Sequence, residues 1–211
     1  MKQLVQEIQV LGNLESFIYY SGVDVVALEK YETYQKRSYR NRYDLVSSTG
    51  LITLSIPLKK GKHASKPIVD VAISYEDNWE RTHLRTIKTC YENSPFFEHY
   101  YDGLVSLFHA HHKTLWSFNT SALTWACTVL GMEKDITFTE EYLRKHENLH
   151  DLRNVVHPRH PSRLKPYSYP QVFEEKQGFI GGASILDLIF NLGPEAKSWL
   201  KAQWLKNEVL H

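Results

Sequence analysis

The run Val23-Asp-Val-Val-Ala-Leu28 restricts the fold more than any other part of the chain. All but one of its residues are apolar. A short and nearly continuous apolar run of this kind is typical of a strand that is buried on both faces. Such strands lie in sheets that helices cover, so the run predicts a protein of the α/β or α+β class.

The rest of the chain divides into a sheet-rich part and a helix-rich part. Residues 1–76 read mostly as strands, and residues 77–211 read mostly as helices. We expect one domain over residues 1–211, with a mixed sheet from the N-terminal half packed by helices from the C-terminal half. The predicted strands cover residues 4–11, 23–28, 42–46, 51–58, 68–75 and 135–139, and the predicted helices cover residues 13–20, 79–91, 96–107, 121–130, 184–190 and 194–209.

Composition excludes several classes of protein. The net charge of +1 argues against a nucleic-acid binder, which normally carries a basic excess over a whole face. No apolar run is long enough to span a membrane, and the first residues do not resemble a signal peptide. Cys90 and Cys127 both lie in segments that read as helix, so we expect buried thiols in a reducing compartment. These features together predict a cytoplasmic protein.

A basic segment follows the buried strand. Residues 34–42 read Tyr-Gln-Lys-Arg-Ser-Tyr-Arg-Asn-Arg and contain four cations and no acid. α/β proteins place ligand-binding loops at the carboxyl ends of strands, and arginine forms bidentate contacts with phosphate or carboxylate. If the segment is extended, Arg40 and Arg42 share one face. The segment therefore predicts an anion site, for which the candidates are Tyr34, Gln35, Lys36, Arg37, Arg40, Asn41 and Arg42.

Four blocks of sequence resemble one family when they are taken in order. They are residues 34–42, Leu-Ser-Ile-Pro-Leu at 54–58, Tyr-Glu-Asn-Ser-Pro-Phe-Phe at 91–97, and Ser-Ile-Leu-Asp-Leu-Ile-Phe-Asn-Leu-Gly-Pro-Glu-Ala at 184–196. Together they are similar to the WbqC-like family, whose members occur in bacterial gene clusters for surface polysaccharide. The resemblance implies a part in O-antigen biosynthesis, with transfer of a glycine or another acyl group to a sugar. One departure is residues 10–16, where family members often have a proline- and aromatic-rich turn and this chain has neither proline nor histidine.

A second motif suggests metal chemistry. His146-Glu147-Asn148-Leu149-His150 has the His-Glu-x-x-His spacing of zinc proteases, which places two histidines on one helix face and a glutamate beside them as a base. Charged residues precede it, and the third histidine of the extended motif is absent. A chance match is the favoured interpretation, and we predict neither a metal nor another cofactor.

His157 and Asp187 are the remaining candidates for catalysis. His157 lies in a stiff His-Pro-Arg-His-Pro turn and is either a general base or a turn histidine bonded to backbone, of which the second is favoured. Asp187 lies among apolar residues and must be paired if it is buried. Two interpretations are equally good: Asp187 pairs with an arginine of the basic segment, or it caps a neighbouring element.

Three hypotheses of function follow from these observations. The first is a transferase of surface-polysaccharide biosynthesis that holds a phosphate-bearing substrate, such as a nucleotide sugar, on residues 34–42. The second is a non-catalytic protein that binds a sugar nucleotide or an assembly partner, and the altered turn at residues 10–16 favours it. The third and weakest is a zinc hydrolase. The sequence leaves a homo-oligomer open.

Overall fold

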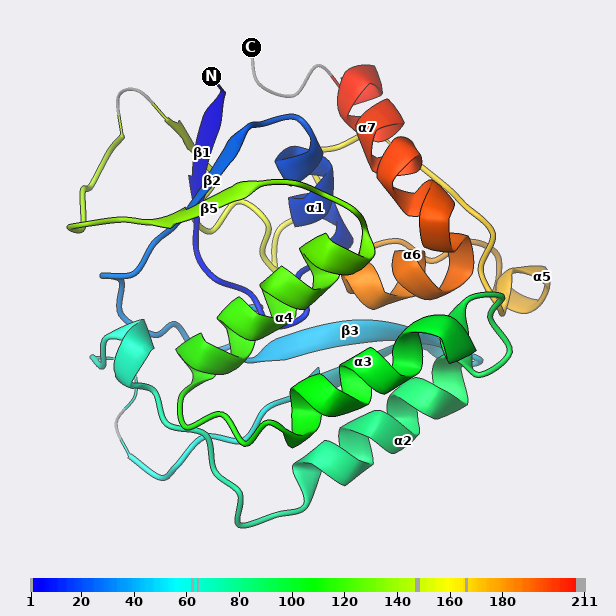
Figure 1. Cartoon of the computed structure of the whole chain (residues 1–211), viewed down its shortest axis with the longest axis horizontal. Helices are drawn as coiled ribbons and strands as arrows, with labels where there is room; N and C mark the ends of the chain where they lie inside the picture. The colour runs from blue at the N-terminus through cyan, green and yellow to red at the C-terminus, as the bar shows by residue number, and fades with distance from the viewer. Residues whose placement is uncertain (1, 62, 64, 147–148, 166, 208–211) are drawn as a thin grey trace.

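The protein contains a four-stranded parallel sheet and a separate antiparallel hairpin, both covered by helices (Figure 1). This computed structural model describes residues 2–61, 63, 65–146, 149–165 and 167–207. The strands are β1 (Gln3–Gln6), β2 (Val25–Leu28), β3 (Arg42–Ser47), β4 (Gly50–Ser55), β5 (Asp135–Phe138) and β6 (His150–Asp151). The helices are α1 (Leu14–Ser21), α2 (Trp79–Tyr91), α3 (Phe97–His109), α4 (Leu115–Val129), α5 (Glu174–Gln177), α6 (Ile185–Leu192) and α7 (Ala196–Asn207).

The parallel sheet has the strand order β5-β2-β1-β6. Its central strand β2 is buried along its whole length, as the apolar run predicts. The helix α1 connects β1 to β2, because parallel neighbours need a crossover. The side chain of Asn13 caps this helix by accepting a hydrogen bond from the Glu15 backbone N–H. The predicted fold class is thus confirmed, although the two outer strands, β5 and β6, come from the C-terminal part of the chain.

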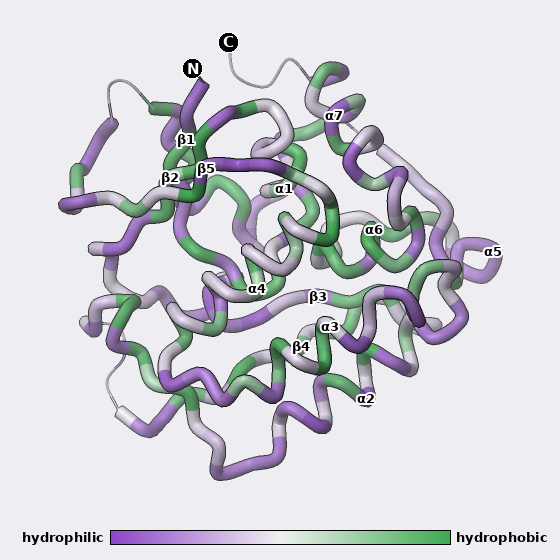
Figure 2. Tube along the Cα trace, viewed as in Figure 1, coloured by the Kyte–Doolittle hydropathy of each residue, from purple (hydrophilic) through white to green (hydrophobic). Residues whose placement is uncertain are grey.

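The helices bury one apolar core between the sheet and the hairpin. The helix α2 packs on β3, α3 packs on both α2 and α4, and α7 packs on α1. Figure 2 shows α6 as mostly hydrophobic, whereas α2 and α7 alternate between hydrophobic and hydrophilic residues. This difference agrees with burial, because nearly every residue of α6 is buried and the two longer helices keep one face in water.

One predicted element is wrong, and the largest shifts in bounds are at the start of α4 and the end of β1. Residues 68–75 form a short 3-10 helix, Ile68–Asp70, followed by single bridges at Ala72 and Ile73. Ile68 and Val71 are three residues apart and are both buried in the core. In a strand, residues three apart point to opposite faces, whereas in a 3-10 helix they lie on the same face. The helix α4 begins at Leu115 rather than Ser121, because the hydroxyl of Thr114 caps it. The first strand ends at Gln6.

No helix in the described part of the chain combines the length and apolar character needed to cross a membrane.

Candidate functional site

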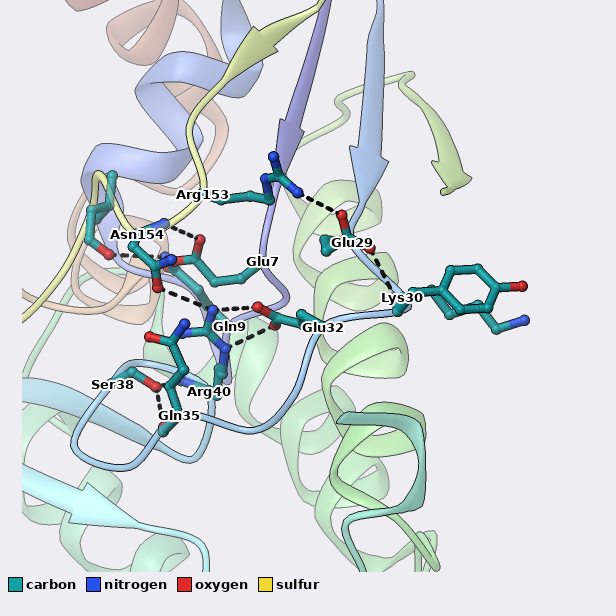
Figure 3. A network of polar contacts seen from close by, with 12 residues as sticks. Glu7, Gln9, Glu29, Lys30, Glu32, Gln35, Ser38, Arg40, Arg153 and Asn154 are labelled. Carbon is teal, nitrogen blue, oxygen red and sulfur yellow. Dashed lines mark hydrogen bonds and ion pairs between the residues drawn. The ribbon is translucent and has the colours of Figure 1, made fainter. Parts of the chain in front are cut away.

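The carboxyl ends of β1, β2 and β6 meet at one edge of the sheet, because the three strands are parallel. Polar residues follow each strand: Glu7 after β1, Glu29 after β2 and Arg153 after β6. Figure 3 shows two groups of polar contacts side by side at this edge, Glu7 with Glu32, Arg40 and Asn154, and Glu29 with Arg153. This edge is where open α/β sheets bind ligands.

Arg40 is the centre of the first group. Its side chain is fully buried, and its Nε donates to Oε1 of Glu32 at 2.8 Å while Nη2 donates to the other oxygen of the same carboxylate. The Nη2 group also donates to Oδ1 of Asn154 at 3.1 Å. The backbone carbonyl of Arg40 accepts a hydrogen bond from Asn119 of α4 at 2.8 Å. Arg40 therefore ties the basic segment to the sheet edge and to a helix.

Glu7 is the second buried carboxyl beside Arg40. Its oxygens accept from the backbone N–H of Asn154 at 2.7 Å and from the amide of Gln9 at 3.1 Å. Burial raises the pKa of Glu7, and the charge of Arg40 lowers it only in part. Burial likewise raises the pKa of Glu32 to about 7 against the pull of Arg40. Both carboxyls therefore lie beside one guanidinium, and burial is the main cause that raises the pKa of each.

Arg153 forms a separate ion-pair group at the same edge. Its Nη1 donates to Glu29 at 2.9 Å, and its Nε donates to Asp151 at 2.9 Å. Glu29 also accepts hydrogen bonds from the Thr139 hydroxyl at 2.8 Å and from the Tyr31 N–H at 2.9 Å. The hydrogen bond to Asp151 raises the pKa of Arg153. All its donor nitrogens are engaged, so we assign Arg153 a structural role.

A cleft with a volume of about 270 Å³ opens beside these ion pairs. Tyr31 and Tyr142 lie on its wall and expose 49% and 54% of their surfaces. The guanidinium of Arg153 lies over the Tyr142 ring, 5.0 Å from its centroid. Exposed aromatic rings at a cleft present an apolar face to a ligand ring. The other lining residues are Glu32, Thr33, Gln35 and Asn154.

The basic segment separates into buried and exposed parts. The hydroxyl of Tyr34 donates to Asn41 at 2.8 Å, and the amide of Asn41 donates to the Ile56 carbonyl at 3.1 Å. These two residues hold the loop in shape. Lys36 and Arg37 are exposed, and Gln35 is exposed on the cleft wall.

Arg42 differs from Arg40 in position. It is partly exposed at the start of β3, and its Nη2 donates to the Arg37 carbonyl at 2.8 Å. Arg40 enters the interior, so the two arginines do not line one extended surface as the alternation predicts. Each nevertheless keeps a buried donor, Nη1 of Arg40 and Nε of Arg42, that has no hydrogen-bond partner among the described residues.

The structure brings His157 to the basic segment. Burial lowers the pKa of His157, and the charges of His160, Arg40, Arg159 and Arg42 lower it further. The positive potential there comes from two chain segments that are distant in sequence. The Nδ1 atom of His157 accepts the backbone N–H of Arg159 at 3.2 Å, so in the neutral ring Nε2 carries the proton. His157 is therefore the backbone-bonded turn histidine, and it presents a donor rather than a base.

The profile of the WbqC-like protein family matches residues 17–164. This chain belongs to the WbqC-like family. A relative, described as the uncharacterised protein Rv1507c of Mycobacterium tuberculosis, is 27% identical over 195 residues, which cover 80% of this chain and 84% of that protein. No solved structure gave a significant match. The match confirms the family resemblance. The matched region contains three of the four sequence blocks and Arg40, Arg42 and His157, and residues 184–196 lie beyond it.

Asp187 of the WbqC-like protein lies apart from this site. It is buried in the first turn of α6, where its Oδ2 accepts hydrogen bonds from the Tyr169 hydroxyl and from the Gln171 amide at 2.7 Å. Burial raises the pKa of Asp187 to about 6. The predicted pairing with an arginine of the basic segment is wrong. Asp187 instead holds residues 169–171 against α6.

The His-Glu-x-x-His motif of the WbqC-like protein does not form a helix at its second histidine. His150 lies in β6, so it does not share a helix face with His146, and Glu147 lies outside the described residues. Over the residues that the structure describes, no group of three or more His, Cys, Asp or Glu side chains is placed to hold a metal ion. Cys90 and Cys127 are buried and unbridged, and burial raises the pKa of each thiol to about 11.

The sequence interpretation missed the acidic half of this WbqC-like site. It did not predict any role for three carboxylates, Glu7, Glu29 and Glu32, or for their partners Arg153 and Asn154. One signal was present, because Glu29 follows directly after the short apolar strand β2. Buried carboxyls at such positions need cationic partners, and the basic segment supplies one.

Proposed function

We propose that this WbqC-like protein binds a phosphate-bearing sugar compound, such as a nucleotide sugar, between residues 34–42 and residues 157–161. The observation that supports the proposal is Nε of Arg42, a buried donor on a partly exposed arginine that lacks a partner within the described residues. A buried guanidinium N–H without an acceptor is costly, and a phosphate oxygen is the acceptor that it favours.

The neighbouring groups suit the same ligand. The Nε2–H of His157 adds a neutral donor, and Lys36 and Arg37 add exposed charge nearby along the chain. Tyr31 and Tyr142 at the cleft offer rings on which a base or a sugar can stack. On this proposal Arg40 serves mainly to position the segment, and Arg42 binds the phosphate.

Arg42→Ala is the sharpest test of binding. We expect it to weaken nucleotide-sugar binding by about tenfold or more, because a charge-assisted hydrogen bond contributes roughly 1.5–3 kcal/mol. Isothermal titration calorimetry against a panel of nucleotide sugars measures the change. Lys88→Ala, which removes an exposed cation from α2, should leave the affinity unchanged. Equal affinity of Arg42→Ala and the wild type across the whole panel would contradict the proposal.

A transfer reaction is the second candidate function. The family resemblance implies transfer of an acyl or aminoacyl group, such as glycine, to a sugar in surface-polysaccharide biosynthesis. Glu32 supports this candidate, because it lines the cleft and burial raises its pKa to about 7, which suits a general base for a sugar hydroxyl. Product formation by the wild type and its loss in Glu32→Gln, with ligand affinity retained, would establish transfer. Binding without product would leave the protein a binding module.

A further inference from the structure

A second groove shares no lining residue with the cleft at the sheet edge and has no part in the function proposed above. The turn that joins β3 to β4 forms one wall, and the outward face of α2 forms the other. The groove has a volume of about 370 Å³, which is in the lower range of about 300–1,000 Å³ for small-ligand sites. Its lining includes Arg81, Arg85 and three threonines of α2, Thr82, Thr86 and Thr89.

Two arginines give the groove its charge. Arg81 and Arg85 lie one helical turn apart on α2, so their guanidinium groups are neighbours and repel each other. Within the part of the chain that the structure describes, neither side chain forms a salt bridge or a hydrogen bond. Glu80, the acid next to them in sequence, faces His111 instead. Two like charges that form no ion pair with an acid of the described residues favour an anion.

Hydroxyl groups give the groove its second property. Thr82, Thr86 and Thr89 each donate their hydroxyl hydrogen to the carbonyl four residues earlier, at 3.3, 2.9 and 3.0 Å respectively. Their oxygens therefore keep lone pairs and act as acceptors. The wall of α2 thus presents arginine donors and threonine acceptors side by side.

The opposite wall is braced from within. Ser47 donates to the Gly50 carbonyl at 2.7 Å and accepts the N–H of Thr49 at 3.2 Å. The side chain of Gln177 donates to the Ser47 carbonyl at 2.6 Å, which ties the turn to α5. Ile52 and Phe173 add apolar surface between the two walls. Hydrogen bonds within the turn and to α5 therefore fix this wall of the groove.

We propose that this groove binds a monosaccharide that carries a phosphate or a carboxylate group. The two guanidinium groups match the anion, because each offers paired donors to its oxygens. The threonine oxygens accept from sugar hydroxyls, and Ile52 with Phe173 covers the C–H face of the ring. A simple inorganic anion would use only the arginines and leave the rest of the lining without a role.

The test is a titration of the full-length protein followed by NMR. Glucose 6-phosphate and glucuronate are the two acidic probes, and glucose and inorganic phosphate are the controls. We expect one of the acidic sugars to shift the amide signals of Thr82, Thr86 and Thr89. We expect Arg81→Ala/Arg85→Ala to weaken that binding by about tenfold or more. Thr86→Val, which keeps the side-chain shape and removes one acceptor, should weaken it by a smaller factor.

Two matched variants separate this groove from the site proposed above. Lys88→Ala removes a cation from the same helix outside the groove, and Arg42→Ala disables the nucleotide-sugar site; both should bind the acidic sugar as the wild type does. If neither acidic sugar shifts the α2 signals, or if the double variant binds equally well, the proposal is wrong. Inorganic phosphate that binds as tightly as the sugar phosphate would also overturn it.

Discussion

Arg40→Ala is expected to lower the free energy of unfolding by about 3–5 kcal/mol, the range for removal of one partner from a buried ion pair. Arg40 is fully buried and neutralises Glu32 through two hydrogen bonds. Its loss leaves Glu32 and Glu7 buried without their cation and also breaks the contact with Asn154. Urea denaturation at neutral pH measures the change.

Two further variants identify the cause of this loss. Arg40→Met combined with Glu32→Leu replaces the pair by apolar side chains. It should recover part of the stability, because the Glu32 carboxyl is no longer left unpaired, while Glu7 still lacks its cation. Arg42→Ala removes a partly exposed arginine two residues away and should cost about 1 kcal/mol or less. If the double variant is no more stable than Arg40→Ala, the unpaired Glu32 carboxyl is not the cause of the loss.

Some features of this fold can be predicted from the local sequence, and others cannot. The strand at residues 23–28, the helix at residues 13–20 and the buried thiols at Cys90 and Cys127 depend on neighbours within a few residues, and the structure agrees with each. In contrast, β6 contains only His150 and Asp151, and a strand of two residues has no periodicity. It exists because β1 offers an open edge, which sequence alone does not reveal.

The candidate site shows the same limit. The concentration of cations identified residues 34–42 as a candidate anion site. Which of its arginines is buried and paired, and which can reach a ligand, depends on residues that are distant in sequence. Arg40 is buried because it pairs with Glu32. Arg42 lies near enough to His157, in a turn more than a hundred residues further along the chain, to lower the pKa of that histidine. A count of cations therefore predicts an anion site, and only the register of β1, β2 and β6 shows which cation is structural and which is free for a ligand.

Asp187→Asn is the second variant with a large expected effect, and that effect depends on pH. Burial raises the pKa of Asp187 in the folded protein from 3.8 to about 6. Between these two values the folded protein holds a proton that the unfolded chain has released, so protonation stabilises the fold. The stabilisation is fully present below about pH 4 and is lost as the pH rises through about 6.

The size of this effect follows from the shift. Each unit of pKa corresponds to about 1.4 kcal/mol. As the pH falls from 7 to 4, the free energy of unfolding of the wild type should therefore rise by about 2–3 kcal/mol relative to that of Asp187→Asn. The difference between the two proteins isolates Asp187, because Glu7 and Glu32 titrate in both. Asp135→Asn removes an exposed carboxylate from β5 and should track the wild type over the same range. Parallel curves for Asp187→Asn and the wild type would show instead that the carboxyl stays ionised between Tyr169 and Gln171, held by their hydrogen bonds alone.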